Sequence, residues 1–79
     1  MDVFVVEKEQ DNFSKMVMAT CRNKRAFIRF SSCGIHVVCL SGVTARALRN
    51  CKTFFTLAEA LAAYKSPEMK AIIAAAAEA

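Results

Sequence analysis

The sequence predicts an α+β domain in which an antiparallel β-meander of three to four strands, in about residues 3–41, precedes two or three helices in about residues 43–78. Three observations predict this fold class. Short β-branched and aromatic segments alternate with polar turns in the first half, the apolar period changes near Gly42, and helix-capping patterns follow in the second half. Because the chain has 79 residues and no internal repeat, we expect residues 1–79 to form a single small domain.

The first two strands are expected on either side of a polar turn. Residues 3–6 are β-branched and aromatic, and the polar residues 9–12 separate them from a second apolar segment. That segment, residues 13–21, contains methionine and alanine, which also suit helices. We interpret it as a strand because it leads into the polar turn at residues 22–24 and then into a clearer strand.

The third strand is predicted by strict alternation in the segment Arg-Ala-Phe-Ile-Arg-Phe, residues 25–30. Side chains alternate between the two faces of a strand, so Ala26, Ile28 and Phe30 are expected on one face and Arg25, Phe27 and Arg29 on the other. Turn residues 31–34 follow, in which Gly34 can adopt a positive φ. Residues 35–40 then form a nearly continuous apolar strand that closes the meander.

Helical signals follow Gly42. Residues 43–50 favour a short helix with Ser41 as a possible N-cap. Thr56 and Glu59 have the spacing of a capping box, which predicts a helix over residues 57–64. Ser66 and Pro67 then have the order of an N-cap and a first helical position, and Met69, Ile72, Ile73 and Ala76 recur at helical spacing after them.

The segment Cys33-Gly34-Ile35-His36-Val37-Val38-Cys39 combines two cysteines with the chain's only histidine. Structural zinc sites need four ligands, often in closely spaced pairs, and strand alternation sends His36 and Cys39 to opposite faces. No acidic residue lies between Asn12 and Glu59 to orient the imidazole for a Cys–His nucleophile. With only two glycines there is also no phosphate-binding loop, so we expect no catalytic residue, metal, cofactor or small-molecule substrate.

The remaining composition indicates a chain that stays in the cytoplasm. The first residues do not have the pattern of a signal peptide, and no apolar run approaches the roughly 18–20 residues that span a membrane. In a reducing compartment the four cysteines, Cys21, Cys33, Cys39 and Cys51, are expected to be free thiols and mostly small apolar residues of the interior.

Charge is distributed unevenly along the chain. Residues 13–58 contain eight basic residues and no Asp or Glu, whereas the two ends carry all seven acids and only three lysines. The middle therefore has a formal charge of +8 and the ends −4, which gives the net charge of +4. Such an acid-free region attracts phosphates or acidic protein surfaces.

The candidate binding residues come from this basic region. Arginine suits both phosphate and carboxylate, and an aromatic ring between two guanidinium groups is typical of single-strand binding surfaces. The competing interpretation places Phe27 in the core or a dimer interface, with arginines extending around it. The predicted nucleic-acid or acidic-partner contacts are Arg22, Lys24, Arg25, Phe27, Arg29, Arg46 and Arg49.

Both faces of the expected meander are apolar, which predicts a covering for each. The C-terminal helices can cover one face and a second copy the other, so we expect a homodimer. The favoured hypothesis is a non-enzymatic module whose basic region engages an acidic partner, with nucleic acid ahead of protein. The alternative is a protein-interaction or inhibitor protein of the small accessory type, as in mobile elements or phages, that acts by steric occlusion without nucleic acid.

Overall fold

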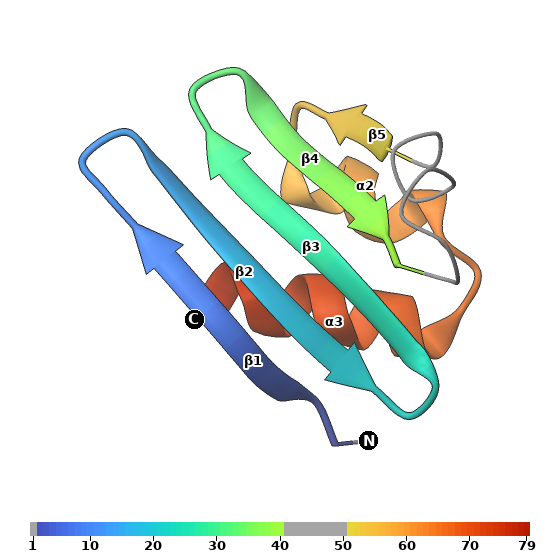
Figure 1. The fold of residues 1–79 in the computed structure, drawn as a ribbon. Coiled ribbons are helices and arrows are strands. Elements are labelled where there is room, and N and C mark those ends of the chain that lie inside the picture. The colour runs from blue at the N-terminus through green and yellow to red at the C-terminus, as the bar shows by residue number, and fades with distance from the viewer. Residues whose placement is uncertain (1, 41–50) are drawn as a thin grey trace.

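The computed structural model describes residues 2–40 and 51–79 of the chain. These residues form an antiparallel sheet of strand order β1-β2-β3-β4-β5, followed by two helices, as Figure 1 shows. The elements are β1 (Phe4–Gln10), β2 (Ser14–Cys21), β3 (Lys24–Ser31), β4 (Gly34–Cys39), β5 (Cys51–Phe54), α2 (Leu57–Ala63) and α3 (Pro67–Glu78). The α+β class and the antiparallel sheet are therefore confirmed.

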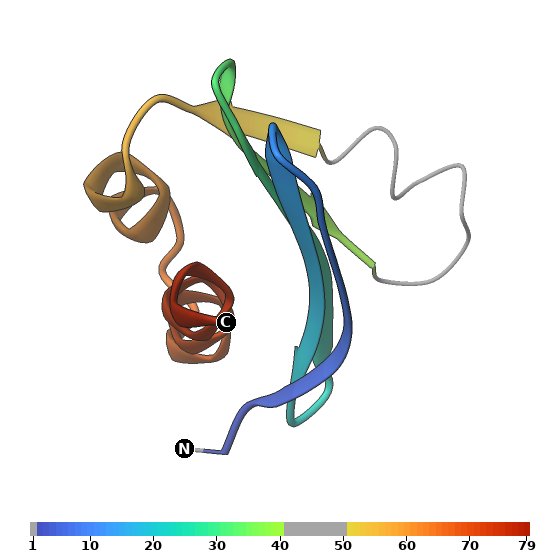
Figure 2. The same ribbon diagram turned by 90° about the vertical axis from the view of Figure 1, so that its left-hand side faces the viewer.

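The domain has two layers. Both described helices lie against the same face of a curved sheet, which we call the inner face (Figure 2). No helix among the described residues lies on the opposite, outer face. Within the described residues, no helix has the length and apolar character needed to cross a membrane.

The core forms between the inner face and the helices because the strands alternate. In β3, Ala26 and Ile28 are fully buried and alternate with half-buried or exposed Arg25, Phe27 and Arg29. The pairing of β2 with β3 aligns the buried residues of both strands, so one continuous apolar surface faces α3. The buried core consists of Val17, Ala19, Cys21, Ala26, Ile28, Ile35, Val37, Ala60, Met69, Ile72, Ile73 and Ala76.

Gly34 lies at the β3–β4 turn with φ +121°, a conformation that side chains rarely adopt. A Cβ atom at this position would lie 2.5 Å from the carbonyl oxygen of Phe54 on β5. Glycine is therefore needed here both for the turn and for the close approach of β5 to β4.

Local capping begins both helices. Thr56 Oγ1 accepts a hydrogen bond from the Glu59 N–H at 3.1 Å, and the Glu59 carboxylate accepts one from the Phe55 N–H at 3.2 Å. One half of the predicted capping box is formed, because Thr56 accepts from Glu59, whereas the Glu59 carboxylate accepts from the residue before the N-cap instead of from the N-cap itself. Ser66 Oγ accepts from the Met69 N–H at 3.2 Å, and Pro67 is the first residue of α3, as the sequence predicts.

Lys15 joins the start of β2 to the end of α3. Its Nζ donates to the backbone oxygens of Ala77 at 2.9 Å and Ala79 at 3.0 Å, and lies 4.7 Å from the centroid of the Phe30 ring. A cation at a helix C-terminus satisfies carbonyl groups that lack partners in the helix and interacts favourably with the helix dipole. This contact joins the C-terminal end of α3 to the start of β2.

The first strand is longer than the sequence predicts. β1 continues through the charged residues to Gln10, and the turn begins only at Asp11. The Asp11 carboxylate accepts hydrogen bonds from the N–H groups of Phe13 at 2.7 Å and Ser14 at 2.8 Å, which makes it the residue that begins the turn. β1 is exposed along its whole length, so charged side chains are compatible with a strand at the edge of the sheet.

The interval assigned to helices, residues 43–78, also contains a strand. β5 pairs antiparallel with β4 and is the second edge of the sheet, so the prediction of three to four strands is corrected to five among the described residues. This strand has only four residues and is specified by its pairing with β4, which a local pattern does not reveal. The helix predicted at residues 43–50 lies outside the described residues.

Candidate nucleic-acid interface

The outer face is defined by the residues that alternate with the core. On the middle strand β3, Arg25 and Arg29 are exposed and Phe27 is half-buried, and all three point away from the helices. The expectation that these three side chains share one face is therefore met. Since Phe27 lies between the two arginines, it is a ring flanked by two positive charges on the face of the sheet that carries neither described helix.

Cross-strand pairing surrounds Phe27 with apolar side chains. Phe27 pairs with Met18 on β2 and with Val38 on β4. Arg29, two positions further along β3, pairs with Met16 on one side and His36 on the other. The centre of the outer face is therefore apolar, with charged and polar side chains around it.

A hollow of about 300 Å³ lies over these two rows of residues. It is lined by Met16, Phe27, Arg29, His36, Val38 and Cys51. Thr53 on β5 forms a hydrogen bond with the imidazole, with 3.1 Å between its Oγ1 and His36 Nδ1. The hollow therefore combines an aromatic ring, a guanidinium group and an imidazole, which can contact a planar ligand that carries negative charge.

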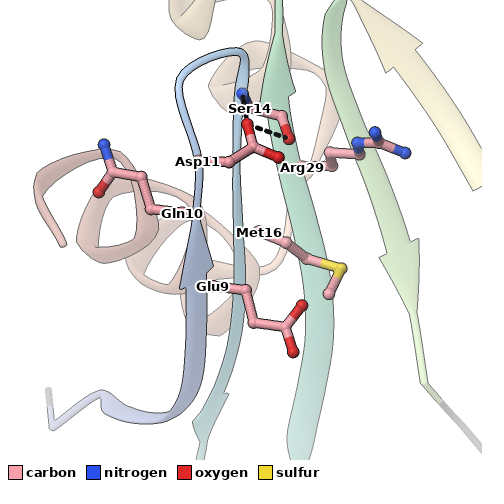
Figure 3. Close-up of a pocket in the computed structure, with 6 residues that line it drawn as sticks. All are labelled: Glu9, Gln10, Asp11, Ser14, Met16 and Arg29. Atoms are coloured by element: carbon pink, nitrogen blue, oxygen red, sulfur yellow. Dashed lines mark hydrogen bonds between the residues drawn. The ribbon is translucent and has the colours of Figure 1, made fainter.

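Acidic side chains border this surface on β1. Glu7 pairs with Met18 and Glu9 pairs with Met16, so both carboxylates belong to the outer face. A second hollow, of about 440 Å³, lies at this border and is lined by Glu9, Gln10, Asp11, Ser14, Met16 and Arg29 (Figure 3). In Figure 3 the Arg29 side chain extends away from the acids, toward β4.

Asp11 adds a further negative charge to this border. The hydrogen bonds from the Phe13 and Ser14 N–H groups hold the pKa of Asp11 below its usual value. The basic surface is consequently limited to β3 and its surroundings and does not extend over the whole sheet.

The structure divides the sequence-predicted binding residues into three groups. Arg25, Phe27 and Arg29 lie together on the outer face. Arg22, which has φ 56°, is exposed in the β2–β3 turn. Lys24 is exposed at the start of β3, where it lies on the same side of the strand as the inner-facing Ala26. Arg46 and Arg49 lie outside the described residues.

Two other basic residues of the acid-free region face the helices. Lys15 caps α3, and the Lys52 ammonium lies 5.2 Å from the centroid of the Tyr64 ring. The sequence alone could have placed Lys15 on the inner face. Lys15 is two and four residues before the buried Val17 and Ala19, and residues at this spacing share one face of a strand. Charge counted along the chain therefore overstates the charge of the outer face.

The cysteines and the histidine do not converge. His36 lies on the outer face, whereas Cys39 packs against the core with its Sγ 4.0 Å from the Met69 sulfur. Cys33 is exposed in the β3–β4 turn. Within residues 2–40 and 51–79, no three side chains of His, Cys, Asp or Glu are placed to hold one metal ion.

Comparison with protein-family models, with curated proteins and with solved structures found no match to this chain.

Proposed function

We propose that this chain is a non-enzymatic binding module that holds single-stranded nucleic acid on the outer face of its sheet. The observation that carries the proposal is the position of Phe27 between exposed Arg25 and Arg29, on a face where no described helix lies. A base can stack on the Phe27 ring while the guanidinium groups contact the phosphates on either side.

The dimensions favour a short, unpaired segment as the ligand. Arg25 and Arg29 are four residues apart on one strand, so their Cα atoms are about 13 Å apart. Stacking on Phe27 requires a base whose face is accessible, which a single strand offers and a duplex hides. Glu7 and Glu9 repel phosphates from the β1 edge, so the strand is expected to run over β3 and β4.

A second candidate function is favoured by the apolar centre of the same face. Met16, Met18, Phe27 and Val38 are all half-buried and adjacent across three strands. Apolar groups with aromatic and methionine side chains at their centre are also typical of protein interfaces. An inhibitor that occludes a protein partner would use this surface without any nucleic acid.

The arginines are tested by fluorescence anisotropy with a labelled single-stranded oligonucleotide over a salt series. Alanine at both Arg25 and Arg29 is expected to weaken binding at least about tenfold. The slope of the logarithm of the binding constant against the logarithm of the salt concentration is expected to become smaller in magnitude by about 0.7 for each phosphate that is no longer neutralised. The matched control replaces Lys8 and Lys65 by alanine, which removes the same charge from exposed positions away from the outer face.

The ring is tested in the same assay. Leucine at Phe27 keeps an apolar side chain but removes the stacking surface, and is expected to weaken binding by about 5-fold to 100-fold. Leucine at Phe55, which is 84% exposed, is the control. Binding that does not depend on salt, or no binding at low salt, contradicts the proposal. A stoichiometric protein partner that survives nuclease treatment would instead support the occluding inhibitor.

A further inference from the structure

Opposite charges lie at equal distances on either side of β2 on the outer face. Glu9 pairs with Met16, and Met16 pairs with Arg29, so the three residues form one row across β1, β2 and β3. Neighbouring strands are about 4.8 Å apart, which places the Glu9 and Arg29 backbones about 10 Å apart with Met16 midway between them. In the next row Glu7, Met18 and Phe27 lie on the same three strands, so an aromatic ring takes the place of the arginine and only the Glu9 row carries opposite charges.

This arrangement is complementary to itself. A two-fold axis that runs along β2, between two sheets packed face to face, places β1 of each copy opposite β3 of the other. Because the axis is parallel to the strands, residues of one row stay in that row. Glu9 of each copy then meets Arg29 of the other, while Met16 and Met18 meet their own copies at the axis.

We propose that a second copy of this chain docks face to face on the outer face, about a two-fold axis along β2. The dimer covers the apolar centre around Met16, Met18 and Phe27 and pairs Glu9 with Arg29 twice. The dimer also occupies the surface assigned to nucleic acid, so the two compete for Phe27 and Arg29. Only this competition rests on the proposed function.

The exposed edge of the sheet fits a second copy less well. If two β1 strands pair about an axis perpendicular to the sheet, each side chain stays on its own face. A pairing centred on the charged part of the strand then places Lys8 opposite Lys8 and Glu7 opposite Glu9. Like charges directly opposite each other destabilise a strand pair, and the irregularity between Val5 and Glu7 further disrupts the edge.

The dimer is tested by sedimentation equilibrium on the full chain without nucleic acid, using charge reversals. The wild-type chain is expected to be a dimer at micromolar concentration. Glu9→Arg alone or Arg29→Glu alone is expected to raise the dimer dissociation constant at least about tenfold, because each places like charges in contact. The two substitutions together restore opposite charges and are expected to restore dimerisation.

Matched controls reverse charges far from the outer face. Glu78→Arg at the end of α3 and Lys65→Glu between the helices change the net charge by the same amounts at exposed positions. Circular dichroism confirms that each variant is folded. The proposal is overturned if the wild-type chain is a monomer, if the single reversals behave like their controls, or if the double reversal fails to restore the dimer.

Competition is tested by adding a single-stranded oligonucleotide to the wild-type dimer. The expected product is a complex with one protomer for each oligonucleotide site, formed as the dimer dissociates. An oligonucleotide bound to the intact dimer overturns the competition. A dimer that binds no oligonucleotide overturns both the competition and the proposed function but leaves the face-to-face dimer standing, whereas a monomer that binds it overturns the dimer alone.

Discussion

Tyr64 follows α2 and carries a hydroxyl group that is enclosed without a hydrogen-bond partner in the part of the chain that the structure describes. Its ring packs edge-on against Phe54, with 6.1 Å between the ring centroids. Burial raises the pKa of Tyr64 to about 12, and the neighbouring Cys39 thiol contributes to this rise. The ring therefore contributes to packing, whereas the hydroxyl has no hydrogen-bond partner of normal geometry among the described residues.

Phenylalanine at position 64 is expected to leave the free energy of unfolding at neutral pH unchanged or to raise it by up to about 1 kcal/mol, because an unpaired buried hydroxyl is removed. The pH dependence is also expected to change. Since the pKa of Tyr64 in the folded state lies above its ordinary value of 10.0, the wild-type chain loses stability as the pH rises from about 10 to about 12. Tyr64→Phe lacks this decrease.

Urea unfolding of both proteins at neutral pH and at about pH 11 measures this difference, because the other titrating groups are common to the two proteins. Equal decreases of stability at high pH would show that the Tyr64 hydroxyl does not titrate as its burial requires. A large destabilisation of the variant at neutral pH would show that the hydroxyl has a partner.

The elements are held together by a small number of contacts between side chains and helix ends. Lys15 is the clearest example, because it links β2 to the last carbonyl groups of α3 across 62 and 64 residues of sequence. Lys70 makes a related link within the helical layer by donating to the Leu61 carbonyl of α2. These contacts add direction to an interface that is otherwise apolar.

Methionine at position 15 keeps the length of the side chain but removes the charge and the donors. We expect Lys15→Met to lower the free energy of unfolding by about 1–2 kcal/mol, since the backbone oxygens of Ala77 and Ala79 at the C-terminal end of α3 lose their charged donor. Chemical denaturation measures this change. Lys65→Met is the matched control, because it removes the same charge from an exposed position between the two helices. Equal effects of the two substitutions would contradict the capping role of Lys15.

The elements that the sequence predicts well are those with a strong local pattern. Alternation in β3 predicts which side chains share a face, and the side chains of Thr56 and Ser66 predict where the two helices begin. β5 and the second half of β1 lack such a pattern. Both are exposed edges whose extended conformation depends on pairing with a neighbour, so the charged residues of β1 give the pattern of a turn.

The sequence predicts the candidate site only as far as it depends on the local pattern of one strand, and not where it depends on pairing between strands. The shared face of Arg25, Phe27 and Arg29 follows from the alternation of one strand. The position of Glu9 in the same row as Arg29 depends on the length and register of β1 and required the structure. Because Glu9 lies near Arg29, the outer face is not uniformly basic but carries opposite charges on either side of β2.

At the scale of the whole molecule, the sheet has two faces with different roles. The inner face forms the core with α2 and α3, and the outer face is the surface to which we assign binding. Every proposal made for this chain places its partner on the outer face, whether that partner is nucleic acid or a second copy. A method that locates the partner on the chain therefore distinguishes the two faces, which an affinity alone does not.

The most direct measurement is an NMR titration of the isotopically labelled chain with a single-stranded oligonucleotide, read from the side-chain signals of both faces. We expect shifts at the Phe27 ring, the Met16 and Met18 methyl groups and the Arg29 side chain, all on the outer face. Side chains of the helices away from the sheet, such as Ala74, should not respond. Shifts concentrated on α2 and α3, or no shift at low salt, would show that the outer face does not bind nucleic acid.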